Sequence, residues 1–180
     1  MKADMRYDGR QLTWNGRGTF KATSGLPAYQ YPSFQCYVDK GPIPEGTYTI
    51  ELKEDIHPAR DDGTDMCRLA PSPRLQTIPR GADAGECERF WVNWGQHRVG
   101  LQPSDSMTKK VCSPHRGGFY LHDSTKGYTH GCIEVDGRFF EVLRCFLRGM
   151  KQHRLPQTSV LVLRVAYAPG VSTYGGTKQP

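Results

Sequence analysis

The sequence predicts a mainly β single domain with one main α-helix directly after a cysteine-containing loop. Its 180 residues include 20 glycines and 13 prolines, a content that favours turns and strands over a helix bundle. Several short segments alternate apolar and polar residues, whereas only one stretch repeats apolar residues at helical spacing. We assign residues 1–168 to one domain and expect the polar, glycine-rich residues 169–180 to form a flexible tail.

The first predicted element is a hairpin in residues 12–25, LTWNGRGTFKATSG, because its Asn15-Gly16 pair suits a tight turn. Residues 41–52, GPIPEGTYTIEL, predict a proline-containing turn and then a strand with one buried face. Residues 53–89 are charged and poor in apolar side chains. They predict a long connection, of the kind that shapes a site or carries disulfides.

Further strands are expected in residues 89–95, 97–103 and 117–123, which read RFWVNWG, HRVGLQP and GGFYLHD. The β-branched run in residues 158–167 predicts a strand buried on both faces.

The main helix is expected to begin at Asp136 as the N-cap and to end near Gly149. Between them, apolar residues recur at the spacing of one helix face: Phe139, Val142, Leu143, Phe146 and Met150.

The formal net charge of +6 admits two interpretations, a solvated surface or affinity for a polyanion. Lysines and arginines are scattered singly, with no block denser than Lys109-Lys110, so we predict no nucleic-acid partner. A mildly basic surface also suits a cell-wall substrate that carries carboxylates. No run of about 18 apolar residues is present, so no transmembrane segment is expected, and the N-terminus lacks the apolar core of a signal peptide.

Cysteine content is high, and no two cysteines form a CxxC pair, which argues against zinc ribbons and thioredoxin-type motifs. If Cys132 is a free nucleophile, five cysteines remain and at most two disulfides can form. Cys145 lies in the predicted helix and is expected to be a buried thiol. The other four lie in loops where disulfides are plausible, with pairing left open: Cys36, Cys67, Cys87 and Cys112.

The segment FYLHDSTKGYTHGCIEV, residues 119–135, carries the candidate chemistry. A free thiol is only a few per cent ionised at neutral pH, so a nucleophilic cysteine needs a base within hydrogen-bond reach. His122 ends a predicted strand, and Cys132 follows ten residues later after a turn that can bring the two side chains together. Gly131 lets the backbone turn tightly and present amides to an oxyanion.

Two other interpretations of this segment remain open. A zinc site could use Cys112, His115, His122, His130 and Cys132, although His130 and Cys132 are too close for a usual finger. The loop could also be an ordinary surface loop. Papain-like peptidases have the cysteine far upstream of the histidine, so the order here argues against that family. No role is expected for His57, His97 or His153.

Three landmarks resemble the L,D-transpeptidase catalytic domains of the YkuD type. They are LHDSTKGYTHGCIEV, the turn and strand GPIPEGTYTI, and the opening YDGRQLTWNGRGTFKATSG. The resemblance is closest to compact effectors that bacteria deliver by type VI secretion into rival cells, and residues 53–117 match least. Thr129 replaces the usual serine, and Glu134 stands where many members have arginine, so that arginine's binding of a substrate carboxylate cannot be transferred.

The resemblance implies an L,D-transpeptidase-like β-sandwich of mixed sheets and a role for each residue of the loop. Cys132 would be the nucleophile and His122 the general base, oriented by the backbone carbonyl of Asp123. His130 and Gly131 would shape the oxyanion pocket. Thr129 would position the loop and two tyrosines, Tyr128 and Tyr120, would contact substrate. Neither a metal nor a cofactor is expected.

The implied activity is that of an L,D-carboxypeptidase or L,D-transpeptidase acting on tetrapeptide stems of peptidoglycan through a thioacyl-enzyme at Cys132. The implied setting is an antibacterial toxin that is made in the cytoplasm without a signal peptide and delivered to the periplasm of a target cell. A cognate immunity protein would be its partner. The alternative is a non-catalytic module on the same fold that binds the cell wall or a protein partner.

Overall fold

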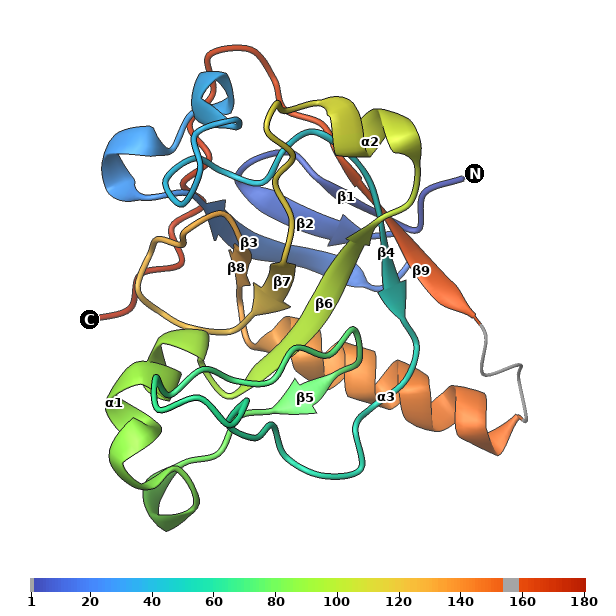
Figure 1. The fold of residues 1–180 in the computed structure, drawn as a ribbon. Coiled ribbons are helices and arrows are strands. Elements are labelled where there is room, and N and C mark those ends of the chain that lie inside the picture. Colours follow the sequence, from blue (N-terminus) through green and yellow to red (C-terminus); the bar gives the residue numbers. More distant parts are fainter. Residues whose placement is uncertain (1, 154–158) are drawn as a thin grey trace.

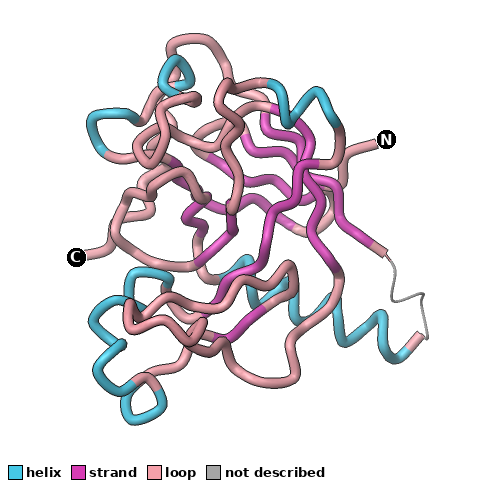
Figure 2. Tube along the Cα trace, in the orientation of Figure 1, coloured by secondary structure: helices cyan, strands magenta, loops and turns pink. Residues whose placement is uncertain are grey.

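The computed structural model describes residues 2–153 and 159–180, and its architecture is mainly β (Figures 1 and 2). The strands are β1 (Met5–Tyr7), β2 (Gln11–Trp14), β3 (Gly18–Ser24), β4 (Gly46–Glu51), β5 (Gln76–Thr77), β6 (His97–Pro103), β7 (Phe119–His122), β8 (Ile133–Val135) and β9 (Val160–Val165). The helices include α1 (Glu88–Trp91), α2 (Ser106–Lys110) and α3 (Arg138–Gln152). The expected mainly β class is therefore confirmed.

The strands form one mixed sheet that closes on itself. Their order is β4-β9-β1-β2-β3-β8-β7-β6-β5, and β4 also pairs with β6, so every strand except β5 belongs to a closed ring. β1 and β9 pair in parallel, as do β7 and β8, whereas the other pairs are antiparallel. The candidate site lies where the parallel pair β7–β8 ends.

Several strands form where the sequence predicts them. β2 and β3 are the arms of the expected hairpin around Asn15-Gly16, and β4 alternates buried and half-buried residues as its period-two pattern requires. β6 and β7 lie within the predicted segments 97–103 and 117–123. β9 occupies most of the predicted strand 158–167, whose first residue lies outside the described residues.

Helix α3 packs its apolar face beneath the sheet (Figure 1). It buries Phe139, Phe140, Leu143, Leu147 and Met150. Its first residue is Arg138 and its N-cap is Gly137, so the expected cap at Asp136 is wrong by one residue. The Asp136 carboxylate nevertheless accepts the Arg138 N–H at 3.0 Å. Among the described residues, no helix combines the length and apolar character that crossing a membrane requires.

The expected strand in residues 89–95 is wrong, because the chain there forms α1 and a short 3-10 helix, Val92–Trp94. Local packing explains the difference. Trp91 is buried in a small second core, and its indole N–H donates to the Cys67 carbonyl at 2.8 Å. Trp91 is therefore buried, with its N–H satisfied, from a helical turn. The apolar pattern of residues 89–95 alone did not indicate this packing.

Four of the six cysteines form two disulfides, Cys36–Cys112 and Cys67–Cys87. These are the four loop cysteines for which bridges were expected. Cys132 and Cys145 are free thiols. The expectation that Cys145 is buried is wrong, because its side chain lies on the exposed face of α3.

The C-terminal segment packs against the sheet, so the expected flexible tail in residues 169–180 is wrong. Thr173 is fully buried, and its hydroxyl donates to the Ser24 carbonyl at 2.6 Å. Gly175 passes so close to the sheet that a Cβ there would lie 2.0 Å from the Ala22 carbonyl oxygen. In residues 169–180, Gly175 therefore allows close backbone contact with the sheet, and hydroxyl side chains such as Thr173 form hydrogen bonds with it.

Candidate active site around Cys132 and His122

Strands β7 and β8 bring the two candidate groups to one face of the sheet. In their parallel register Leu121 lies opposite Ile133, and His122 lies opposite Glu134. Cys132 immediately precedes β8, and its sulfur accepts the Tyr120 N–H at 3.4 Å. Since alternate residues of a strand share a face, Tyr120 and His122 lie on the same side as Cys132 and Glu134.

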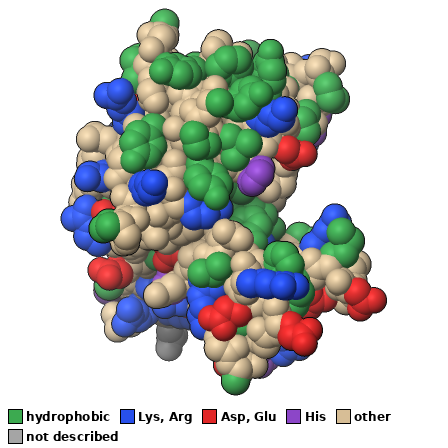
Figure 3. All heavy atoms as spheres, turned by 90° about the vertical axis from the view of Figure 1, so that its left-hand side faces the viewer, with side chains coloured by type: hydrophobic (Ala, Val, Ile, Leu, Met, Phe, Trp, Pro, Cys, Tyr) green, Lys and Arg blue, Asp and Glu red, His purple; other side chains and the backbone are tan. Residues whose placement is uncertain are grey.

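His122 and Cys132 also line the same cavity, whose volume is about 360 Å³. The molecule is hollowed between its main body and the lower lobe that contains α1 (Figure 3). Three more of the predicted site residues, Tyr128, Thr129 and His130, line the cavity with them, as do three residues that the sequence did not indicate: Asn93, Trp94 and Lys126.

The loop before Cys132 is held by Thr129. Its hydroxyl donates to the Cys132 carbonyl at 2.5 Å and accepts the N–H groups of Gly25 and Gly131, each at 3.1 Å. Gly131 has a φ of +126°, and a Cβ there would lie 2.4 Å from an Arg116 nitrogen. The expected tight turn is thus present, but the Gly131 N–H is already bonded to Thr129 and is not free for an oxyanion.

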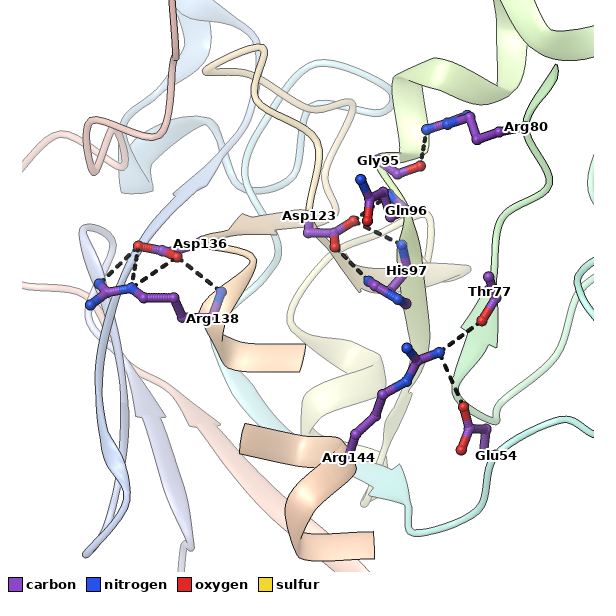
Figure 4. Close-up of polar contacts among 10 residues, drawn as sticks. All are labelled: Glu54, Thr77, Arg80, Gly95, Gln96, His97, Asp123, Asp136, Arg138 and Arg144. Carbon is purple, nitrogen blue, oxygen red and sulfur yellow. Dashed lines mark hydrogen bonds and ion pairs between the residues drawn. The ribbon is translucent and has the colours of Figure 1, made fainter. Parts of the chain in front are cut away.

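The His122 ring is held by Ser124. Its Nδ1 lies 3.1 Å from Ser124 Oγ, and Ser124 Oγ in turn donates to Glu134 Oε2. The Asp123 carbonyl, expected to orient His122, is replaced in this position by the Ser124 hydroxyl. The Asp123 carboxylate instead contacts His97 Nδ1 at 2.7 Å and accepts the His97 N–H at 2.8 Å (Figure 4).

Burial is the main cause of the shifted pKa values of His122 and Cys132. Burial, together with the cations Lys126 and Arg98 and against a raising effect of Asp123, lowers the pKa of His122 to about 3. Burial raises the pKa of Cys132 to about 11, although the Tyr120 N–H and nearby cations oppose it. At neutral pH the site therefore holds a neutral thiol and a neutral imidazole.

The low pKa of His122 predicts that acid destabilises the protein through this one group. Below pH 6.5 an unfolded histidine binds a proton that the buried His122 refuses down to about pH 3, so the free energy of unfolding falls as pH falls through that window. Between pH 7 and pH 4.5 we expect wild type to lose roughly 3 kcal/mol more than His122→Asn. Urea unfolding of both proteins at the two pH values measures the difference, and equal losses would contradict the assignment.

Two cavity residues that the sequence did not indicate give it an aromatic wall and a positive charge: Trp94 and Lys126. Trp94 packs edge-on against His122 and Tyr120, with ring centroids at 5.4 Å and 5.3 Å. Lys126 is half-buried, and its ammonium lies 4.8 Å from the Tyr128 ring centre. Burial lowers the pKa of Lys126, opposed by the Glu134 and Cys132 charges. An under-solvated ammonium in a cavity is suited to bind an anionic group. The aromatic ring of Trp94 and the charge of Lys126 were visible in the sequence, but nothing there placed them beside Cys132.

Arg116 holds together two backbone segments beside the cavity, residues 41–42 and the loop at His130. Its buried guanidinium donates to the carbonyls of Pro42, Gly41 and His130, at 2.8, 3.2 and 3.3 Å. His130 itself is exposed, with Nδ1 at 2.9 Å from the Asp39 carbonyl. Tyr31, Tyr37 and Val38 are exposed apolar side chains. Figure 3 shows hydrophobic side chains gathered on the upper part of this face of the molecule.

The zinc interpretation loses its first ligand. Cys112 is joined to Cys36 in a disulfide, and His115 Nδ1 contacts the Lys109 carbonyl at 2.9 Å. Over the described ranges, one close group of potential metal ligands exists, Asp61 with Cys67 and Cys87, and both of its cysteines form a disulfide. A thiol in a disulfide cannot act as a thiolate ligand.

The geometry therefore assembles a thiol, a neutral imidazole, a cation and an aromatic wall around one cavity. No model of a known protein family matches the chain, and comparison with curated proteins also yields no match.

Proposed function

We propose that this protein is a cysteine acyl-transferring enzyme of the L,D-transpeptidase type, acting on peptidoglycan tetrapeptide stems. The observation that carries the proposal is that the Cys132 thiol and the His122 ring line one cavity of about 360 Å³. A cavity of this size is in the range of small-molecule sites and admits the end of a stem peptide. The mainly β class and the single long helix after the cysteine loop support the proposal at the level of fold class, whereas the strands other than β5 form one closed ring and not the expected sandwich of separate sheets.

In the proposed reaction His122 assists the attack as a general base. As the Cys132 sulfur bonds to the carbonyl carbon at the L-centre of the third stem residue, its proton passes to His122. His122 then gives that proton to the amine of the departing D-alanine, which leaves a thioester. Water resolves the thioester in a carboxypeptidase, and a D-amino acid or a neighbouring stem amine resolves it in a transpeptidase.

Lys126 is our candidate for binding a substrate carboxylate. Glu134 cannot do so, because it is itself an anion, and it is fully buried with its carboxylate oxygens already accepting hydrogen bonds within the protein. Lys126 lines the cavity together with Cys132 and His122 and carries the opposite charge to a stem carboxylate. This assignment supplies the cation that the expected arginine would have provided.

The two disulfides support an oxidising place of action, since such bonds persist in the bacterial periplasm and are rare in reducing cytosol. Delivery by type VI secretion into a rival's periplasm would meet this requirement. An immunity protein that covers the Cys132 cavity would then protect the producing cell. Both statements rest on the sequence resemblance.

The test is incubation of the purified protein with tetrapeptide muropeptides, followed by mass spectrometry. We expect loss of D-alanine, and with an added D-amino acid we expect its incorporation at position four. Release without exchange identifies a carboxypeptidase, and exchange identifies a transpeptidase. Muropeptides that remain unchanged at high enzyme concentration would reject the enzyme and favour the binding module.

A further inference from the structure

Glu134 lies at the centre of a saturated hydrogen-bond network. It is fully buried, and each carboxylate oxygen accepts two hydrogen bonds. Oε1 receives the Gly127 N–H at 2.7 Å and the Thr177 hydroxyl at 2.5 Å. Oε2 receives the Lys126 N–H at 3.0 Å and the Ser124 hydroxyl. Four donors match the accepting capacity of an ionised carboxylate.

This network determines which nitrogen of His122 carries the proton. Ser124 has one hydroxyl proton, and that proton is donated to Glu134 because an ionised carboxylate can only accept. The Ser124 oxygen must therefore accept in its 3.1 Å contact with His122 Nδ1. Nδ1 then carries the hydrogen, and Nε2 keeps the lone pair that accepts a proton.

We propose that Ser124 and Glu134 are positioning residues that hold His122 as the Nδ1–H tautomer, with Nε2 as the base toward Cys132. This inference deepens the proposed function and rests on it for its catalytic consequence. When Nε2 takes the thiol proton, Nδ1–H continues to donate to Ser124, so the network needs no rearrangement. The negative charge of Glu134 then lies two hydrogen bonds from the new imidazolium and stabilises it.

The C-terminal segment belongs to the same network. Thr177 donates to Glu134, and its oxygen also lies 2.9 Å from Thr23 Oγ1 on β3. Gln179 further secures the segment, since its N–H donates to the Thr125 carbonyl at 3.1 Å. The Glu134 carboxylate is thus fixed from two sides, by the loop after His122 and by the end of the chain.

The experiment reads the tautomer directly, without substrate. Long-range ¹H–¹⁵N correlation spectra of protein labelled with ¹⁵N at histidine distinguish the two ring nitrogens, and His122→Gln identifies the His122 signals among the six histidines. At neutral pH we expect His122 to show a protonated Nδ1 and an unprotonated Nε2. A protonated Nε2 in the wild-type protein would overturn the inference.

Substitutions at Ser124 and Glu134 test the chain of contacts. Ser124→Ala removes the acceptor for Nδ1–H, and we expect a mixture of tautomers and a fall in kcat on the order of 10²-fold, with KM little changed. Ser124→Thr, which keeps the hydroxyl, should restore both. Glu134→Gln should act like Ser124→Ala, whereas Glu141→Gln, at an exposed position of α3, is the matched control. Thermal unfolding verifies that each variant is folded.

The outcomes separate this inference from the proposed function. An unchanged tautomer and kcat in folded Ser124→Ala would reject the positioning role while leaving the enzyme proposal intact. A wild-type protein that shows the Nδ1–H tautomer but leaves muropeptides unchanged would reject the enzyme and retain the network.

Discussion

Replacing Cys132 with alanine is expected to reduce the rate of D-alanine release or exchange by on the order of 10⁴-fold or more, because no other group in the cavity can form the thioester. Losses of this size are typical when a nucleophile is removed. The measurement is mass spectrometry of tetrapeptide muropeptides over time. Periplasm-directed expression of the same variant should abolish toxicity, since the toxicity is expected to follow from the reaction.

The chain provides a matched control in its second free thiol. Cys145 is exposed on α3, and Cys145→Ala should keep wild-type activity. Both variants should unfold at temperatures close to that of wild type. Wild-type turnover in Cys132→Ala would refute the thioester mechanism, and loss of activity in Cys145→Ala would relocate the nucleophile.

Removal of the Cys36–Cys112 disulfide by a double alanine substitution is expected to lower the free energy of unfolding by about 4 kcal/mol. The bond spans 76 residues, and a long closed loop restricts the unfolded chain more than a short one. It also joins the segment before the Pro42 turn to the loop before β7 that carries Arg116, so its loss should loosen the backbone held by Arg116 beside the cavity and reduce activity. Urea unfolding and the muropeptide assay measure the two effects.

The Cys67–Cys87 disulfide supplies the comparison, because it spans only 20 residues. Its removal should cost about 3 kcal/mol by the same loop argument. It joins Cys67 to Cys87, the N-cap of α1, and Trp94 lies in the short helix that follows α1. Its removal should therefore affect activity by displacing Trp94 from the cavity. The loop explanation would fail if the shorter disulfide proved the more stabilising of the two.

The sequence predicted the elements whose pattern is local. Asn15-Gly16 predicted a hairpin, alternation in residues 46–51 predicted a half-buried strand, and helical spacing predicted α3. His122 and Cys132 were also predictable as neighbours, since one ends a strand and the other follows a glycine-containing loop. Each of these features depends on residues that are close in the chain.

Long-range contacts were not predictable in the same way. Trp94 reaches His122 from a segment that resembles a strand in its composition, and its helical turn depends on packing around Trp91. Glu134 stood out as a departure from a familiar motif, but only the pairing of β7 with β8 shows that it faces His122 through Ser124. Thr177 joins the network across 43 residues of sequence, and no periodic pattern encodes such a contact.

The closed strand ring has a consequence for self-association. Open sheet edges are templates for pairing with other chains, and crowded or partly unfolded proteins aggregate through them. Because β4 pairs with both β9 and β6, each ring strand has a partner on both sides over at least part of its length, and among the strands of the described residues the two-residue β5 alone pairs on one side. Self-association by strand addition therefore has little backbone to use, which favours a monomer that remains dispersed at high local concentration.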